Sequence, residues 1–384
     1  MEYLFWILIT IGLILCAGYL FLIASFCVAW TCMRQEPQIP NHSVFVSVLV
    51  AVRDEAQTIE KCLQAIASQN YPHEKFELIV IDDHSFDATA SIVQAFASKT
   101  NCITYLKLSE GAAGKKAAIS YGIEKSKGEL IVTTDGDCLM NVHWLEAVVA
   151  KYKHANAKMI VGPVAFHNEN SLFEKMQSLE FMALIASGGG ALFYKKAIMS
   201  NGANLAFKKE IFYEVGGYNS EKLIASGDDV LLMYKINEKY PASVVFLKDK
   251  EAIVYTKAKA SLSAFVQQRK RWASKGFSVL NIETQLVSLV VYLMSAYLVI
   301  VPFLGGVCFS NTPFYQPFIG ICLIILGIKC IIDFLLLFLS ACFFQKKRLL
   351  ILFIPEQIIY LLYVVLFGLI GSIGKYEWKG RKTN

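Results

Sequence analysis

Carboxylates follow three apolar, β-rich runs of the sequence, as Asp54-Glu55, Asp82-Asp83 and Asp135-Gly136-Asp137. Acidic side chains that gather in one place repel one another unless a cation or hydrogen-bond donors offset their charge. Mg²⁺ in proteins takes one or two carboxylates together with phosphate oxygens and water, and Gly136 lets a ligand approach the backbone closely. The three groups predict a site for a divalent cation and a diphosphate. An Asp-x-Asp triplet alone also fits an ordinary turn, so the prediction depends on the strands before it.

A second set of residues could bind a phosphate or move a proton. Arg271, in Gln268-x-x-Arg271-Trp272, could donate two parallel hydrogen bonds to a diphosphate. Trp272 has a flat apolar face on which a ring could stack. Both residues could instead anchor an amphipathic helix at a membrane surface, and the two roles are compatible. Asp229 could accept a proton, or it could cap the helix expected over residues 230–237.

Strands and helices alternate around the acidic groups. Strands are expected over residues 44–52, 76–81, 103–107, 129–134 and 159–165, and helices over residues 58–69, 89–97, 114–125 and 141–152. This alternation predicts an α/β fold with a mostly parallel sheet and helices on both faces. Ligands of such sheets bind beyond the carboxyl ends of the strands, where the acidic groups would converge.

Four apolar segments are long enough to cross a bilayer, which takes about 20 residues. They cover residues 3–30, 286–307, 318–344 and 349–373 of a chain that is 55% hydrophobic. A cleaved signal peptide would have a basic start and a shorter apolar core. Because the first segment begins with Glu2 and no basic residue, we expect an uncleaved anchor. Lys329 and Asp333 lie one helical turn apart within the third segment, where a charged pair serves either a function or a helix contact.

The expected organisation is therefore an anchor over residues 1–33, a soluble domain over 34–280 that ends in an interfacial amphipathic helix, and a transmembrane region with a basic tail over 281–384. Arg34 follows the first segment, and the positive-inside rule then places the soluble domain in the cytosol. The basic tail is also expected inside, so one C-terminal segment could be interfacial or re-entrant. The net charge of +6 is modest, no basic and aromatic stripe indicates nucleic acid, and ten cysteines show no metal-type spacing.

Several segments of the soluble block resemble those of family 2 glycosyltransferases with a GT-A fold, a Rossmann-like mixed sheet flanked by helices. The segments are Val46 to Glu55, Val80 to Thr89, Gly114-Lys115-Lys116, Asn201 to Phe207, Val215 to Tyr218, Gly227-Asp228-Asp229 and Gln268-x-x-Arg271-Trp272. The resemblance covers roughly residues 45–276. The chain departs from the family pattern at Ala51, where the family has proline, at Asp54 for asparagine, and at Asp228 for glutamate.

The resemblance implies a role for each matching residue. The donor nucleotide would contact Glu55, Asp83, Lys115 and Asp135, and Mg²⁺ or Mn²⁺ would bind Asp135 and Asp137. The general base would be Asp229. The diphosphate or the acceptor would contact Asp228, Gln268, Arg271 and Trp272. Lys115 and Lys116 also fit a solvated helix face, so their role depends on the resemblance.

The resemblance implies an inverting membrane glycosyltransferase that uses a nucleotide-diphospho-sugar, with UDP favoured as the carrier and GDP as the alternative. The acceptor would be a growing glycan or a membrane lipid, at the cytosolic face of a bacterial plasma membrane. A Gln-x-x-Arg-Trp element is typical of processive synthases, but single-transfer lipid glycosyltransferases carry variants of it. A non-catalytic subunit of an export complex would be expected to lack Asp137, Asp229 or Arg271. A transporter built on Lys329 and Asp333 would not need the large soluble block.

Overall fold

The computed structural model describes residues 1–35, 43–218, 228–273, 281–370, 377–378 and 381–382. The chain divides into two compact units. The sheet unit comprises Met33–Asn170 and Ala191–Ala258, and the helical unit comprises Met1–Cys32, Ser171–Gly190 and Lys259–Asn384. Residues 171–190 and 259–273, which the sequence places in the soluble block, thus group with the apolar helices.

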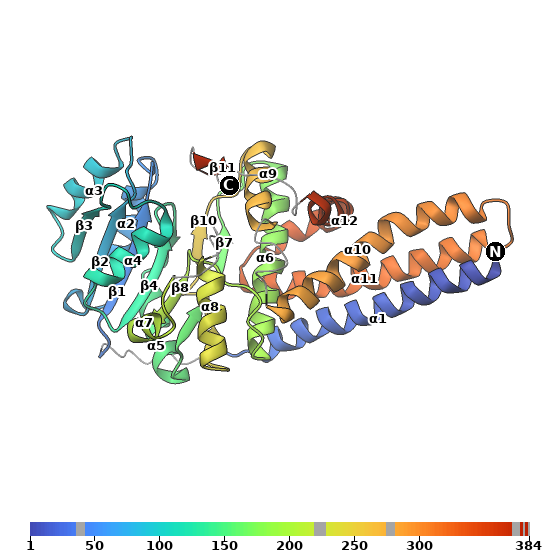
Figure 1. The fold of residues 1–384 in the computed structure, drawn as a ribbon, viewed down its shortest axis with the longest axis horizontal. Helices are drawn as coiled ribbons and strands as arrows, with labels where there is room; N and C mark the ends of the chain where they lie inside the picture. Colours follow the sequence, from blue (N-terminus) through green and yellow to red (C-terminus); the bar gives the residue numbers. More distant parts are fainter. Residues whose placement is uncertain (36–42, 219–227, 274–280, 371–376, 379–380, 383–384) are drawn as a thin grey trace. The chain divides into compact units, whose positions relative to one another are not determined.

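The sheet unit contains a seven-stranded mixed sheet with the order β3-β2-β1-β4-β8-β6-β9 (Figure 1). The strands are β1 (Val46–Val52), β2 (Phe76–Asp82), β3 (Ile103–Lys107), β4 (Leu130–Asp135), β6 (Met159–Val161), β8 (Leu205–Lys208) and β9 (Val244–Phe246). The first four are parallel, whereas β8 runs antiparallel to β4 and β6. The central strands β1, β2 and β4 are almost entirely buried, which follows from helices covering a parallel sheet. The predicted α/β fold is confirmed.

Helices alternate with these strands along the chain. They are α2 (Ile59–Ala67), α3 (Thr89–Ala97), α4 (Lys115–Lys125), α5 (Trp144–Ala155), α7 (Lys209–Glu214) and α8 (Asp228–Lys239), with the short 3-10 helix η1 (His73–Lys75). Helix α4 packs closely on the sheet at Gly122, where an added Cβ would lie 2.8 Å from Ile81 Cδ1. A glycine at this position lets the helix that begins with Lys115 approach the strands.

A single strand predicted over residues 159–165 is two strands in two sheets. β6 ends at Val161, and β7 (Val164–Phe166) pairs with β10 (Val254–Thr256), which also pairs with β5 (Leu139–Met140). The break falls at Gly162-Pro163. A Cβ on Gly162 would lie 2.3 Å from the Asn204 side chain, which donates to the carbonyl of Pro163. Proline also lacks the N–H that a continuous ladder needs.

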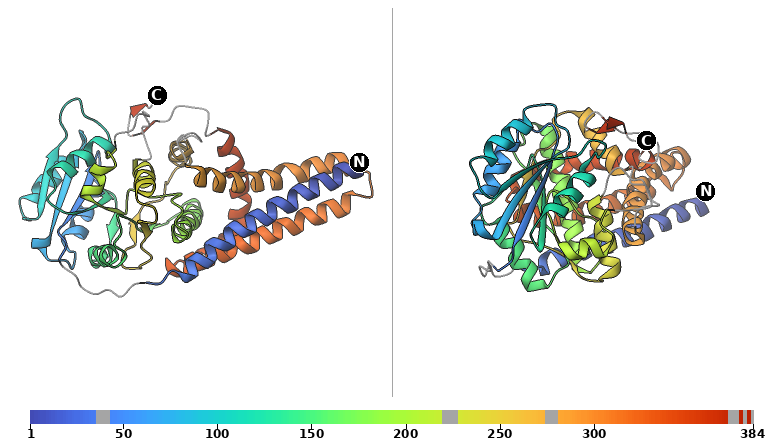
Figure 2. Two further views of the ribbon diagram at one scale, coloured as in Figure 1. Left: turned by 60° about the horizontal axis from the view of Figure 1, so that its bottom comes forward. Right: turned by 60° about the vertical axis from the view of Figure 1, so that its left-hand side comes forward.

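The helical unit contains four helices long and apolar enough to cross a membrane, among the residues that the structure describes. They are α1 (Glu2–Cys32), α10 (Ile282–Phe309), α11 (Tyr315–Phe343) and the segment Lys347–Leu369, which joins the 3-10 helix η2 (Lys347–Leu352) to α12 (Phe353–Ile370). One N-terminal and three C-terminal spans are predicted from the sequence, and the four candidate helices agree with that number and order. Helices α1, α10 and α11 run side by side in the views of Figures 1 and 2.

Four further elements belong wholly or mostly to the helical unit. They are α6 (Leu172–Phe193), α9 (Leu262–Ala273) and the two short C-terminal strands β11 (Glu377–Trp378) and β12 (Arg381–Lys382). Helix α9 packs against α12. Pro302 lies inside α10, and Pro355 lies in the first turn of α12, where the missing N–H costs little.

Lys329 and Asp333 form a buried ion pair inside α11, with Nζ and Oδ2 at 2.5 Å. Tyr19 of α1 donates to the other Asp333 oxygen at 2.7 Å, and Lys329 donates to Gln357 of α12 at 2.7 Å. The pair therefore contacts helices α1 and α12 through hydrogen bonds. Since polar groups in such apolar surroundings must be satisfied by other protein groups, a helix contact accounts for the pair.

Candidate active site

The acidic groups predicted to converge do lie at one edge of the sheet. In the register of the sheet, Val52 of β1 stands opposite Asp82 of β2, and Ala51 stands opposite Asp135 of β4. The amide of Asp83 then donates to the carbonyl of Val52 at 2.9 Å. Since parallel strands end at the same edge, the carboxylates from β1, β2 and β4 become neighbours there.

Asp82 accepts hydrogen bonds from the loop after β2 and from β3, whereas Asp83 accepts one from the loop before α4. Asp82 is buried, and its two oxygens accept from Ser85 and from the Tyr105 hydroxyl at 3.0 Å. Burial and the nearby Asp82 carboxylate raise the pKa of Tyr105 to about 12, so this hydroxyl keeps its proton. Asp83 Oδ2 accepts from the amide of Gly114 at 3.0 Å, immediately before α4.

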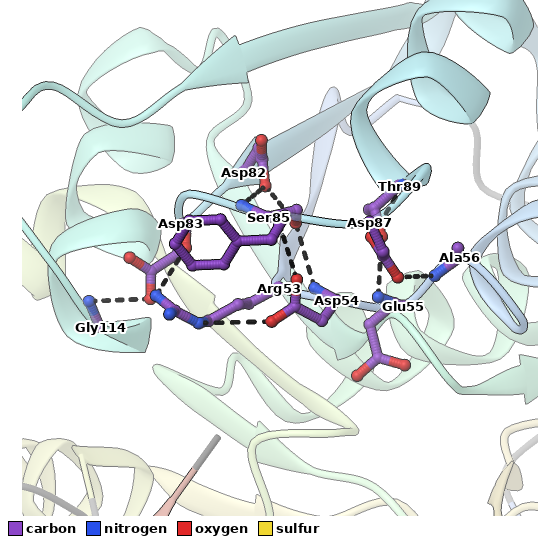
Figure 3. Close-up of polar contacts among 11 residues, drawn as sticks. Arg53, Asp54, Glu55, Ala56, Asp82, Asp83, Ser85, Asp87, Thr89 and Gly114 are labelled. Atoms are coloured by element: carbon purple, nitrogen blue, oxygen red, sulfur yellow. Dashed lines mark hydrogen bonds and ion pairs between the residues drawn. The ribbon is translucent and has the colours of Figure 1, made fainter. Parts of the chain in front are cut away.

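Hydrogen bonds brace the loop after β1 against the loop after β2 (Figure 3). The bonds run from Asp54 N to Ser85 Oγ, from Glu55 N to Thr89 Oγ1, from Ala56 N to Asp87 Oδ2 and from Phe86 N to Asp54 Oδ1, at 2.8 to 3.1 Å. Asp87 also accepts from the amide of Thr89, at the start of α3. Ser85, Asp87 and Thr89, the later polar positions of the Asp-Asp-x-Ser-x-Asp-x-Thr segment, are therefore the hydrogen-bond acceptors that hold the loop after β1 in place.

Arg53 and Phe86 are two residues of this region that the sequence reasoning missed. The Arg53 guanidinium lies 5.5 Å from the centroid of the Phe86 ring, and its Nη1 donates to the carbonyl of Asp83 at 3.2 Å. The Phe86 side chain is 86% exposed. An arginine next to acidic residues and an aromatic residue within the acidic segment were the signals that could have identified them.

Gly136 is required by protein packing at the turn after β4. A Cβ there would lie 3.0 Å from Val52 Cγ1 and 3.4 Å from Glu55 Cγ. The Glu55 carboxylate accepts from Thr58 Oγ1 at 2.8 Å. The turn that carries Asp135 and Asp137 is therefore held closely against the end of β1.

Asp135, Asp137 and Cys138 bring potential ligand atoms within 4.8 Å of one another. Asp137 Oδ2 accepts from Thr256 Oγ1 of β10 at 2.9 Å, which orients that carboxylate. Burial and the two carboxylates raise the pKa of Cys138, so its sulfur remains a neutral thiol. Hard divalent cations bind oxygen ligands. The donor set thus fits Mg²⁺ or Mn²⁺ through the two aspartates.

Lys115 lies near two of the predicted site carboxylates, those of Asp135 and Asp229. It is the first residue of α4, and its ammonium forms an ion pair with Asp135 Oδ1. Burial would lower the pKa of Lys115, but the Asp135 carboxylate, with Asp229 adding, raises it. A Cβ on Gly202 would lie 3.2 Å from Lys115 Nζ and 3.7 Å from Asp229 Cβ, so a glycine leaves room for both side chains.

Asp228 and Asp229 occupy the first turn of α8, where the helix dipole favours negative charge. Asp229 Oδ2 accepts from the amide of Gly202 at 3.0 Å. Asp228 lies 3.0 Å from Lys116 Nζ; burial raises the pKa of Asp228, and Lys116 lowers it by less. Gly227, the residue before Asp228 in the sequence, lies outside the described residues.

The predicted site residues divide between the two units. Those in the sheet unit are Glu55, Asp83, Lys115, Asp135, Asp137, Asp228 and Asp229. Gln268, Arg271 and Trp272 lie on α9 of the helical unit. There, Trp272 stacks on Phe181 with ring centroids 6.3 Å apart. Among the described residues, the buried Oε1 of Gln268 has no hydrogen-bond partner.

Known proteins resemble this chain in sequence and in fold. The sequence model of the family described as "Glycosyl transferase family 2" matches residues 47–216. The chain is 32% identical to the glycosyltransferase AglE of Haloferax volcanii over 186 residues, 48% of this chain and 59% of that protein. It is 25% identical to the poly-beta-1,6-N-acetyl-D-glucosamine synthase of Staphylococcus epidermidis over 238 residues, 61% of this chain and 55% of that protein. The chain thus matches little more than half the length of these relatives.

Among solved structures, one that shares the fold is the mannosyltransferase PcManGT from Pyrobaculum calidifontis in complex with GDP-Man and Mn²⁺. The TM-score is 0.54 at 18% sequence identity, and the match covers 94% of this chain and 99% of that one. At this identity the likeness concerns the fold, a mixed α/β sheet with flanking helices.

Proposed function

We propose that the chain, whose residues 47–216 match the sequence model of the family 2 glycosyltransferases, belongs to that family and moves a sugar, with inversion, from a nucleotide-diphospho-sugar to a growing glycan or a lipid-linked acceptor. The observation that carries the proposal is the arrangement around Lys115. Its ammonium pairs with Asp135, Asp229 lies beside it, and the Asp137 carboxylate follows Asp135 on the same turn. One place thus offers two carboxylates that could hold a cation, a charged ammonium group and a third carboxylate that could accept a proton.

In the proposed reaction, Asp229 takes the proton of the attacking acceptor hydroxyl. The hydrogen bond from Gly202 N to Oδ2 fixes the orientation of this carboxylate at the N-terminus of α8. General-base assistance of this kind contributes roughly 10²–10⁴-fold to a rate. Asp228, which is paired with Lys116, would contact the diphosphate or the acceptor.

Asp135 and Asp137 would hold a divalent cation, Mg²⁺ or Mn²⁺. When bound, such an ion offsets the charge of the leaving diphosphate. Lys115 would contact the same diphosphate, because its raised pKa keeps it charged. Asp83 and Glu55, at the ends of β2 and β1, would bind the nucleoside.

The roles expected for Gln268, Arg271 and Trp272 on the acceptor and diphosphate side are part of the proposal. The unpartnered Gln268 oxygen supports it, because such an atom can accept from a sugar hydroxyl. The four candidate spans support a membrane location with a membrane-bound acceptor. The proposed organisation keeps residues 1–33 as an anchor, 34–280 as the catalytic domain with its interfacial helix, and 281–384 as the membrane region. The catalytic side would face the cytosol of a bacterial cell, beside any export-complex subunits.

The alternative within this class is a single transfer to a lipid. The Staphylococcus relative is named a polysaccharide synthase, and Gln268-x-x-Arg271-Trp272 favours processive synthesis. Only four candidate spans in the described chain make a self-contained export channel harder to build, which favours the lipid product. The two products differ in solubility and can be separated directly.

The test uses membranes that contain the full chain. They are incubated with radiolabelled UDP-sugars or GDP-mannose, with Mn²⁺ or with EDTA. We expect label to appear only with the cation, either in the organic extract or in retained polymer, and an Asp229→Asn variant to lose at least 100-fold in rate while it still binds donor. Full turnover by Asp229→Asn would mean that Asp229 is not the general base. Failure of the wild-type protein to use any nucleotide-sugar would contradict the proposal as a whole.

A further inference from the structure

Arg269 is the most buried charged residue of α9, although it lies between the motif positions Gln268 and Arg271. It is 2% exposed, and it forms an ion pair with Glu180 of α6, which is 9% exposed, with Nη2 and Oε2 at 2.5 Å. Removing two charges from water is costly unless their geometry is good and their remaining groups are satisfied. A buried pair joining two helices therefore restricts how those helices can sit against each other.

Aromatic rings surround the Arg269 guanidinium. Its central carbon lies 4.7 Å from the ring centroid of Phe265, 4.3 Å from that of Trp272 and 5.6 Å from that of Tyr363. Burial raises the pKa of Glu180, and the Arg269 guanidinium and a hydrogen bond with Tyr363 lower it by less. The cluster thus includes side chains from α6, α9 and α12.

Trp272 is held from two directions within this cluster. It lies over Arg269, and its ring stacks on Phe181, the residue next to Glu180 on α6, with an interplanar angle of 26°. Arginine on an aromatic face combines cation–π attraction with planar stacking. Moving the Arg269 side chain would therefore change the surroundings of Trp272.

Helix geometry extends this effect to the rest of the motif. Phe265, Arg269 and Trp272 follow one another at intervals of four and three residues, so they share one face of α9. Arg271 is two residues from Arg269, about 160° away around the helix, and Gln268 is about 100° away. The ion pair that fixes the Arg269 face against α6 thereby sets the directions in which Gln268 and Arg271 project.

We propose that Arg269 and Glu180 are positioning residues for the acceptor side of the reaction. They fix the rotation of α9 and the ring of Trp272, and they do not contact the substrate themselves. The inference rests on the proposed function, since α9 carries the residues expected to contact the acceptor. The proposal gives a role to Arg269, the arginine inside the Gln268-x-x-Arg271-Trp272 element that the proposed reaction does not use.

The test compares full-length Arg269→Gln and Glu180→Gln with Lys270→Gln, a charge removal at the next position of the same helix. We expect the first two variants to lose at least 10-fold in transfer to acceptor, while Lys270→Gln stays within twofold of the wild type. Binding of a nucleoside diphosphate with Mn²⁺ should change far less than transfer, by no more than threefold in all three, because most of the residues proposed to bind it, Asp83, Lys115, Asp135 and Asp137 among them, belong to the sheet unit. Arg269→Lys should restore less than half of the activity, since an ammonium lacks the planar fork.

Two results would overturn the proposal. One is transfer within twofold of the wild type in Arg269→Gln. The other is a parallel loss of nucleotide binding, which would mean a general loss of structure. A second readout does not need the reaction: the fluorescence of Trp272, taken as the difference between each protein and its Trp272→Phe partner, should shift in Arg269→Gln and in Glu180→Gln but not in Lys270→Gln. Wild-type protein that transfers no sugar would contradict the proposed function, and an unshifted Trp272 spectrum would still overturn the positioning role.

Discussion

Lys115 and Asp135 form an ion pair at the carboxyl end of β4, so the ammonium group shares the Asp135 carboxylate with the cation proposed to bind there. The same lysine lies beside Asp229. One ammonium group thus offsets the charge of two carboxylates. Binding of a cation and a diphosphate would give Lys115 a new anionic partner, and this exchange is open to measurement.

Lys115→Met should have opposite effects on the binding of Mn²⁺ and on the binding of a nucleoside diphosphate. Removing the competing ammonium from Asp135 should tighten Mn²⁺ binding in the absence of nucleotide. Nucleoside diphosphate binding should weaken by roughly 10- to 100-fold, the size of a lost charge-assisted hydrogen bond of about 1.5–3 kcal/mol. Calorimetric titration of the purified protein measures both, with Lys125→Met at the exposed end of the same helix as the control. Parallel weakening of both ligands would contradict this exchange.

Asp87→Asn should destabilise the braced loops after β1 and β2. Burial would raise the pKa of Asp87, but hydrogen bonds from Thr89 and from Ala56 lower it below the usual value. A depressed pKa contributes stability that is complete above the unfolded-state value of about 3.9 and is lost as the pH falls through the folded-state value. Because Asp87 is exposed to solvent, which screens its charge, we expect a cost of at most about 0.5–1 kcal/mol at pH 7.

The pH dependence provides the check on Asp87. Denaturant unfolding of wild type and Asp87→Asn should show a constant difference from about pH 5 to pH 8 and a shrinking one below about pH 4. Asp87→Glu, which keeps the charge but displaces the oxygens, serves as the control for geometry. A difference that grows on acidification would be incompatible with the pattern of hydrogen bonds at Asp87.

Much of this arrangement could be predicted from the sequence, because it depends on local pattern. Apolar runs that end in acidic pairs predicted both the strands and the convergence of Asp82, Asp83 and Asp135 at one edge. Long uncharged segments predicted the four candidate spans. Both signals follow from periodicity and length, which do not require knowledge of distant contacts.

The features that the sequence did not predict depend on contacts between residues far apart in the sequence. The break at Gly162 follows from the Asn204 side chain, 42 positions later, so residues 159–165 alone read as one strand. Arg269 looks like one more solvent-facing base in a basic helix until its partner Glu180 is known. In the same way, Arg53 and Phe86 approach each other only because β1 and β2 are neighbours.

Asp333→Leu should be strongly destabilising, because it leaves Lys329 buried without its partner carboxylate. Lys329 is 1% exposed, and loss of one member of such a pair costs about 3–5 kcal/mol. The double variant Lys329→Met/Asp333→Leu should recover most of this loss, since an apolar pair of similar volume avoids the unpaired charge. Thermal unfolding of the protein in detergent compares the three forms. A double variant less stable than Asp333→Leu would contradict the explanation.

The central claim is that Asp135 and Asp137 form one cation site that accepts a diphosphate, and titration of Mn²⁺ followed by electron paramagnetic resonance tests it most directly. We predict one Mn²⁺ per wild-type chain, bound more tightly when a nucleoside diphosphate is present. Asp137→Asn should weaken that binding at least 10-fold, whereas Glu124→Gln on the exposed end of α4 should not. Unchanged Mn²⁺ affinity in Asp137→Asn, with or without the nucleotide, would contradict the account.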